Sequence, residues 1–232
     1  GKKKFTATRV EDAILYNCFR NSCTVKGRRK VGRTVYDIKK KMNGDSVPKK
    51  VIDFELPEYF SRDLTACDDF IKVWDLSGIK LYYDVKNDRV VFPIYREGKL
   101  IDAIGRALFR TDVPKWYKYG QNCSYYAHTM FSSDPLTAVV VEDVISAVTV
   151  ANYFNVTGFG ILGTSLQQEH LYTLSDFDRV VIALDPDASK KSLQHAKDLA
   201  NYVSDVRVLK LTDDLKYKNL EDFEKLKEIL NG

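Results

Sequence analysis

The stretch Thr137-Ala-Val-Val-Val141 runs directly into Glu142 and Asp143. A short run of mostly β-branched residues without polar alternation is typical of a strand buried on both faces, as in a parallel sheet. Apolar residues at helical spacing follow from 144 to 150. The stretch therefore predicts a buried strand, an acidic turn and a helix, which is the repeating unit of an α/β fold.

A second apolar run, Val180-Val-Ile-Ala-Leu184, ends in Asp185-Pro-Asp187. Ligands of open α/β sheets bind beyond the carboxyl ends of the strands, so Glu142, Asp185 and Asp187 are expected at one edge. Hard cations prefer a few carboxylate oxygens, completed by water and substrate phosphate. The spacing predicts a site for Mg²⁺ or Mn²⁺, and the alternative is that the acids only cap helices.

Three blocks of the sequence, in this order, resemble the TOPRIM domain, the catalytic fold shared by bacterial and phage primases, topoisomerases and some nucleases. The blocks are residues 139–147, Leu162-Gly-Thr-Ser-Leu166 and residues 183–188. The resemblance implies that Glu142, Asp185 and Asp187 are catalytic and hold the metal. Many cellular members carry Glu-Gly-x-x-Asp in the first block. This chain has Asp143 and Ser146 at those positions, a form that resembles phage primases, so one acid is missing and the number of metals stays open.

The chain has 232 residues, of which 44% are hydrophobic, as in soluble globular proteins. No apolar run approaches the roughly 18 residues of a membrane span, and no signal peptide is recognisable, so a cytoplasmic protein without a membrane partner is expected. Residues 1–50 hold 15 Lys and Arg against 4 Asp and Glu, a net charge of +11, whereas the remainder carries −7. A basic arm on an acidic body predicts a nucleic-acid contact at the N-terminal end.

The four cysteines are too few and too scattered for a disulfide framework. Cys18 and Cys23 resemble the second knuckle of a zinc ribbon, as found before many primase cores, but structural zinc usually needs four ligands. The alternative is two free thiols in a basic turn. The stretch Gly27–Thr34 approaches a phosphate-binding loop, but Arg33 replaces its lysine, and a basic loop is the better interpretation. A short helix is expected over 35–42.

Residues 58–136 are expected to form a second lobe. A helix is predicted over 66–74, a hairpin over 80–95 with its turn at 86–88, and another strand over 100–107. This lobe resembles the N-terminal lobe of the primase polymerase core, in which a basic face packs beside the metal centre. By position, Arg106 and Lys115 match the basic residues of the family, and Arg89, Lys118 and Arg110 are weaker candidates for binding nucleotide or template. The alternative for Arg106 and Lys115 is that they are simple surface cations.

The end of the chain predicts a helix over 188–203, a third parallel strand over 206–211 and a closing amphipathic helix over 220–230. Primases carry an acidic loop after this third strand, and Asp214 is the residue that resembles it. Asp214 is therefore a possible accessory metal ligand, and a plain turn is the alternative.

Together these features predict an α/β protein. We expect a basic arm over 1–43, a linker over 44–57, an α+β lobe over 58–136 and a TOPRIM domain over 137–232, with a central parallel sheet flanked by helices. The resemblance to the catalytic core of DnaG-like primases covers roughly residues 60–225. It implies metal-dependent synthesis of RNA primers from NTPs on single-stranded DNA, with a replicative helicase as a possible partner and Zn²⁺ if the ribbon is complete. The alternatives are a TOPRIM nuclease, a topoisomerase fragment, and a non-catalytic module that binds single strands or a helicase.

Overall fold

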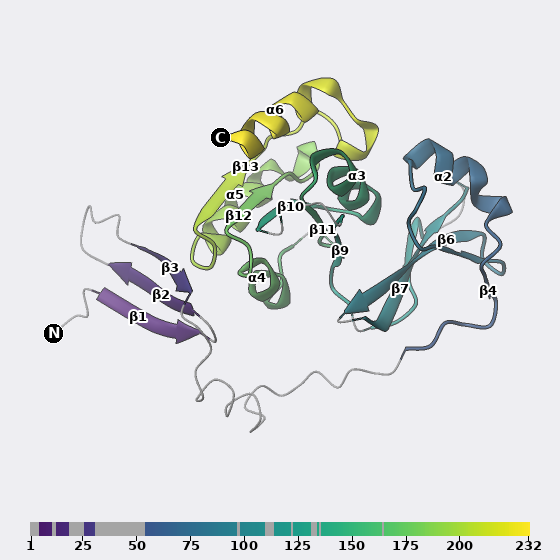
Figure 1. Cartoon of the computed structure of the whole chain (residues 1–232), viewed down its shortest axis with the longest axis horizontal. Helices are drawn as coiled ribbons and strands as arrows, with labels where there is room; N and C mark the ends of the chain where they lie inside the picture. Colours follow the sequence, from purple (N-terminus) through teal and green to yellow (C-terminus); the bar gives the residue numbers. More distant parts are fainter. Residues whose placement is uncertain are drawn as a thin grey trace.

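The structure is a computed structural model of the chain (Figure 1). It describes residues 5–10, 13–18, 26–30, 54–96, 98–109, 114–121, 123–130, 134, 136–163 and 165–232. The helix expected over 35–42 lies outside these residues, as do Cys23 and Arg110. The described strands form three sheets, with the orders β1-β2-β3, β4-β5-β6-β7-β8 and β13-β12-β10-β11-β9.

The strands are β1 (Phe5–Val10), β2 (Ala13–Cys18), β3 (Lys26–Lys30), β4 (Phe60–Ser61), β5 (Tyr82–Asp84), β6 (Arg89–Arg96), β7 (Lys99–Ala107), β8 (Trp116–Lys118), β9 (Tyr126–His128), β10 (Thr137–Val141), β11 (Thr157–Gly160), β12 (Arg179–Ile182) and β13 (Asp205–Val208). The α-helices are α2 (Asp68–Trp74), α3 (Val144–Phe154), α4 (Gln168–Leu174), α5 (Ser189–Leu199) and α6 (Leu220–Asn231). Three short 3₁₀ helices are η1 (Thr65–Cys67), η2 (Pro186–Ala188) and η3 (Leu215–Tyr217).

The third sheet is the parallel sheet that the apolar runs predict. Strand β10 lies between β11 and β12 and is parallel to both, and β13 extends the sheet beyond β12. All five residues of β10 are buried, because the strand has neighbours on both edges and is covered on both faces. The α/β class and the parallel sheet flanked by helices are confirmed.

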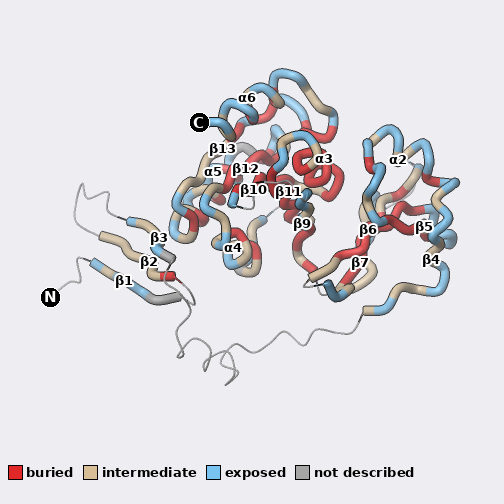
Figure 2. The backbone as a smooth tube through the Cα atoms, in the orientation of Figure 1, coloured by how far each residue is buried: buried red, intermediate tan, exposed pale blue. Residues whose placement is uncertain are grey.

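Side chains of the central strands alternate between two apolar cores. Val139 and Val141 of β10 pack in one core with residues of α3 and α6, whereas Ala138 and Val140 pack in the other with α4 and α5. The first core also contains Val90, Phe92, Ile94 and Ile104 of the second sheet. Buried residues of the two lobes therefore belong to one cluster, and Figure 2 shows buried segments in both lobes. Within the described residues, none of the helices has the length and apolar content needed to cross a bilayer.

Local signals fix the position of α3, the helix that follows the first acidic turn. Asp143 caps its first turn, because the carboxylate accepts a hydrogen bond from Ser146 N–H at 2.9 Å. Asn155 ends the helix in the left-handed conformation. The helix crosses β11 so closely that a Cβ on Gly158 would lie 1.8 Å from the Ala147 carbonyl oxygen. Glycine at this position allows α3 to reach the sheet.

The second sheet is antiparallel throughout, and its β5–β6 hairpin is the one predicted from the turn at 86–88. The helix expected over 66–74 begins as a 3₁₀ turn and becomes α-helical at Asp68. Strand β9 belongs to the third sheet, where it pairs antiparallel with β11. The third sheet therefore includes a strand from before the boundary expected at residue 137, and β9 covers an otherwise open edge of β11.

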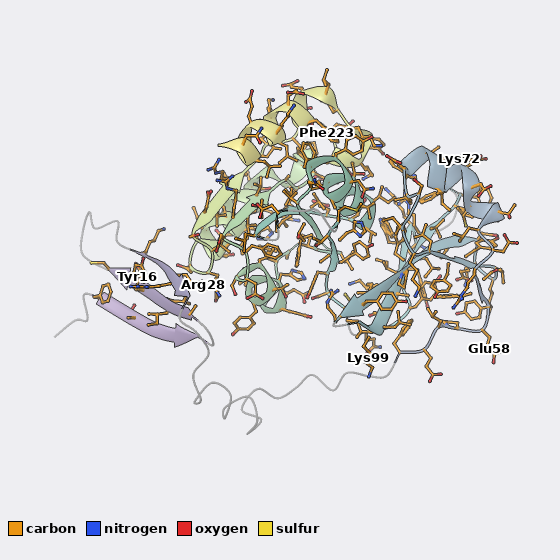
Figure 3. The ribbon with its side chains drawn as sticks, viewed as in Figure 1. Tyr16, Arg28, Glu58, Lys72, Lys99 and Phe223 are labelled. Carbon is orange, nitrogen blue, oxygen red and sulfur yellow. The ribbon has the colours of Figure 1, made fainter. Side chains whose placement is uncertain are left out.

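In the N-terminal sheet, β1 and β2 form an antiparallel pair. The basic loop expected over Gly27–Thr34 is wrong in its described part, because 26–30 form β3. Basic side chains do not prevent a strand here, since β2 supplies the backbone pairing and Tyr16 lies over Gly27. Tyr16 and Arg28 lie on this sheet in Figure 3, and the Arg28 guanidinium donates to the carbonyl oxygen of Ser175, after α4.

Candidate nucleotidyl-transfer site

The acidic residues that follow β10 and β12 are brought together by the pairing of these two strands. Val140 lies opposite Ile182, so Glu142 and Asp185 leave the sheet side by side. The Asp185 N–H donates a hydrogen bond to the Glu142 carboxylate. Burial, followed by the charges of Asp185 and Asp187, raises the pKa of Glu142 to about 7. These carboxylates therefore share one negative region without enough positive charge to balance it.

Asp185 and Asp187 differ in their surroundings. Asp185 is half-buried, and burial raises its pKa, with further upward contributions from Asp143, Asp187 and Asp213. Asp187 lies on η2, one turn further along the chain, and is exposed. It contributes charge to the region, while Glu142 and Asp185 are the pair held in place by the sheet.

The fit of this region to a divalent cation depends on how many carboxylates are required. In the described part of the chain, no three His, Cys, Asp or Glu side chains converge in a way that could hold a metal ion. Mg²⁺, however, is commonly bound through one or two carboxylates and keeps several waters. Glu142 and Asp185 supply two such groups, and their pKa values are raised first by burial and then by neighbouring carboxylate charges, both of which a bound cation would oppose. Glu142 and Asp185 fit a two-carboxylate site, whereas a three-carboxylate cluster that would include Asp187 is not formed within the described residues.

A second set of acids beside the pair is already engaged with the protein. Lys216 Nζ lies 3.1 Å from Asp143 Oδ2 and also forms an ion pair with Asp214. The Ser146 hydroxyl donates to Asp214 Oδ1 at 2.6 Å and lies 3.1 Å from Asp143 Oδ1. Asp214 further caps η3, accepting from Lys216 N–H. Asp214, expected as an accessory metal ligand, therefore has its oxygens occupied by a serine, a lysine and a backbone N–H.

The opposite wall of the region comes from the second sheet, and Arg106 is its central residue. Its guanidinium lies over the Trp116 ring, 5.2 Å from the ring centre. Arg106 Nε and Nη1 are buried and have no hydrogen-bond partner among the residues that the structure describes. Burial lowers the pKa of Arg106, and the charges of Asp143 and Tyr217 oppose that shift. Buried N–H groups without a partner are unusual, and these two are suited to donate to an anion.

Strand register explains why Arg106 faces the acids and Arg89 does not. Arg106 lies opposite Val90, and Arg89 opposite Ala107, so the two arginines point to opposite faces of the sheet. Val90 belongs to the core shared with the TOPRIM domain. Arg89 is only 5% exposed, and its guanidinium donates to the Pro114 carbonyl oxygen at 2.7 Å. This placement speaks against the nucleotide contact predicted for Arg89.

The two lysines of this lobe lie near β8. Lys118 pairs with Ile104 across the strands, so it shares the face of Arg106, and it is exposed. Burial lowers the pKa of His170, and the charge of Lys118 lowers it further by a smaller amount. Lys118 therefore lies near His170, which belongs to the lobe of the third sheet. Lys115 precedes β8 and is exposed, and its carbonyl oxygen accepts from Ala107 N–H. Both lysines are thus available to a ligand, and Lys118 lies on the better placed face.

The acids and Arg106 are held in register by contacts between the lobes. The rings of Trp74 and Tyr217 lie 5.7 Å apart, and Lys218 pairs with Asp75 at 3.3 Å. On the other side Arg96 donates to the Tyr125 carbonyl oxygen at 2.8 Å. The acids after β10 and β12 therefore lie on one side and Arg106 on the other, an arrangement that suits a phosphate bound through a metal cation.

Comparisons with known proteins show what the chain is similar to. No family model matches the chain. The DNA primase of Buchnera aphidicola is 30% identical over 142 residues, which are 55% of this chain and 24% of that protein. The zinc-binding and RNA polymerase domains of Aquifex aeolicus primase superpose with a TM-score of 0.51 at 22% identity, covering 74% of this chain and 50% of that one.

The chain has the fold of a primase catalytic core. A second structure, the primase fragment of the bacteriophage T7 primase-helicase protein, has a TM-score of 0.49 at 16% identity and covers 68% of this chain and 70% of that one. The chain spans about a quarter of the curated relative and half of the Aquifex structure.

Within this primase-core fold, sequence reasoning missed Lys216 and the part played by Asp143. The available signal was Ser146 at the position of an acid, because a missing carboxylate changes the charge that its neighbours must balance. The zinc prediction stays untested. Cys18 lies on β2 and is partly buried, and Cys23 lies outside the described residues.

Proposed function

We propose that this chain is the catalytic core of a DNA primase, which joins NTPs into short RNA primers on a single-stranded DNA template. The observation that carries the proposal is the guanidinium of Arg106, which has no hydrogen-bond partner for Nε and Nη1 in the described residues and lies within the electrostatic reach of Asp143, beside the Glu142–Asp185 pair. The primase-core fold supports it, because that fold includes the second lobe on which Arg106 lies. A nuclease needs only a scissile phosphate and water, whereas polymerisation also requires a site for the triphosphate.

Each group has a distinct task in this proposal. Glu142 and Asp185 would hold Mg²⁺ or Mn²⁺, with Asp187 in reach of its waters. When bound, the cation supplies charge stabilisation and orientation of the reacting oxygens. Arg106 donates its free N–H groups to the phosphates of the incoming nucleotide, and Lys115 and Lys118 extend this cationic wall toward the template. The guanidinium is fixed against Trp116 before the nucleotide binds, so little ordering is needed at that stage.

The biological setting is part of the same proposal. The Glu-Asp-x-x-Ser-Ala form of the first acidic block supports a phage-type primase. The net charge of +11 in residues 1–50 supports a role of this arm in holding the single-stranded template. A replicative helicase is a natural partner for such a core, because primers are needed where single strands are produced.

The test is incubation of the chain with single-stranded DNA, labelled NTPs and Mg²⁺ or Mn²⁺, followed by separation of the products by length. The wild-type protein should extend labelled RNA, and Asp185→Asn should abolish the signal at nearly constant side-chain volume. Asp198→Asn is the matched control, because Asp198 contacts Gln194 on the exposed side of α5. Shortened DNA without NTP incorporation would indicate a nuclease. Binding of DNA without either product would indicate a non-catalytic module.

A further inference from the structure

Lys216 is a buried lysine inside the acidic region. Only 6% of its side chain is exposed, and its ammonium group contacts Asp143 and Asp214. Lysine is rarely buried unless it is paired, so this position is determined by the two carboxylates. The same charge acts on Asp185, whose pKa it lowers against the larger effect of burial. Lys216 therefore acts on both parts of the acidic region, the Asp143–Asp214 pair and the Glu142–Asp185 pair.

The two halves differ in what neutralises them. Asp143 and Asp214 share the Lys216 ammonium and the Ser146 hydroxyl, and they also cap α3 and η3. Glu142 and Asp185 make no direct ion pair among the interactions of the described residues: Glu142 accepts a backbone N–H and feels the charge of exposed Lys191, and Asp185 feels the charge of Lys216. Asp143 and Asp214 are ion-paired with a lysine of the chain itself. Glu142 and Asp185 form the pair of carboxylates that could bind a cation.

We infer that Lys216 is a built-in cation that takes the place of a second metal ion, so that this site binds a single divalent cation at Glu142 and Asp185. The inference rests on the proposed function, because it assumes that the acidic region holds a catalytic metal. A second divalent ion at Asp143 and Asp214 would have to displace an ammonium that the chain itself holds in place. Lys216 acts as a positioning residue, since it works through Asp143 and Asp214.

Ser146 fits this assignment. An acid at this position would place a further negative charge against Asp143 and Asp214, more than one lysine can neutralise. A serine instead donates a hydrogen bond to Asp214 and adds no charge. With a neutral residue at 146, the single charge of Lys216 is set against the two carboxylates of Asp143 and Asp214, and no third carboxylate is added.

The experiment counts bound Mn²⁺ on the full chain by electron paramagnetic resonance, in which only free Mn²⁺ gives a strong signal, together with melting temperatures. The wild-type protein should bind one ion. Lys216→Met should bind two, and added Mn²⁺ should raise its melting temperature more than that of the wild type. Lys218→Met is the control and should bind one ion, because Lys218 pairs with Asp75 and Tyr153 outside the acidic region.

Two ions on the wild-type protein, or one on folded Lys216→Met, would overturn the inference while leaving the primase proposal intact. No ion on the wild-type protein would remove the proposed metal centre as well. If Lys216→Met does not fold, Asp214→Asn decides. This variant should still bind one ion, because Asp214 contacts Lys216 and not the metal, and loss of Mn²⁺ binding would show that Asp214 is a ligand.

Discussion

Replacing Arg106 with methionine should weaken nucleotide binding while leaving the free protein as stable as before, or more so. Methionine keeps most of the side-chain stem against Trp116 and removes the guanidinium. Arg106 Nε and Nη1 make no hydrogen bond within the described residues, so their loss leaves no described group unpaired. A buried charged group without hydrogen bonds costs free energy in the folded state, and its removal is expected to recover part of that cost.

The size of the binding effect follows from the contacts that Arg106 has available. A hydrogen bond to a charged group contributes about 1.5–3 kcal/mol. The KM for NTP is therefore expected to rise by about ten-fold to a hundred-fold. Metal binding should be little changed, because Arg106 faces the acidic pair across the lobe junction and is not part of it.

Arg89→Met is the matched control, since it makes the same change on the other face of the sheet. Arg89 donates to the Pro114 carbonyl oxygen and is buried. Its loss should lower the melting temperature and leave the KM for NTP unchanged. Primer synthesis at varied NTP concentration and thermal unfolding measure both quantities for both variants. The reasoning is refuted if Arg106→Met lowers the melting temperature by several degrees without changing KM, because Arg106 would then be a structural residue.

Two further predictions concern the framework of the site. His170 is fully buried, with Nδ1 accepting from Gln167 N–H and Nε2 donating to the Ser124 carbonyl oxygen, and burial lowers its pKa. The unfolded chain then binds the proton more readily, so stability is complete above about pH 6.5 and falls as the pH drops through the folded-state pKa. The loss of melting temperature between pH 7.5 and 5.5 should be smaller in His170→Asn, and an equal loss would contradict this. Gly158→Ala should lower the free energy of unfolding by about 1–3 kcal/mol or more in a denaturant titration, because α3 must move away from β11. Gly163→Ala should change the free energy of unfolding little, because a Cβ at this position would lie 3.8 Å from the nearest atom, the Ile161 carbonyl oxygen.

The sequence is sufficient for the central part of the fold because each signal there is local. The β-branched runs that form β10 and β12 can be buried only between other elements, and Asp143 marks the start of α3. The meeting of Glu142 and Asp185 follows from parallel pairing alone. These features depend on neighbours in the chain and on one rule of sheet geometry.

The parts that the sequence did not predict depend on register and on distant contacts. Arg89 and Arg106 are both arginines on strands of the same sheet, and their local sequences do not distinguish them. Only the register between β6 and β7 shows that Arg89 is buried on one face while Arg106 lies on the face toward the acids. Lys216 lies 73 residues from Asp143 in the sequence, and no local pattern links the two. The position of β9 could not be predicted either, because a strand of three residues carries almost no periodicity.

The apolar core that runs through both lobes has a consequence for how this enzyme core is built. Phe92 and Val148 belong to one continuous cluster, so neither lobe can bury its own apolar surface alone. A chain cut at residue 137 would also lose β9 and expose the edge of β11, a template for aggregation. The two lobes therefore depend on each other for burial of this shared cluster, so exchange of one lobe between related chains would require matching residues in the other.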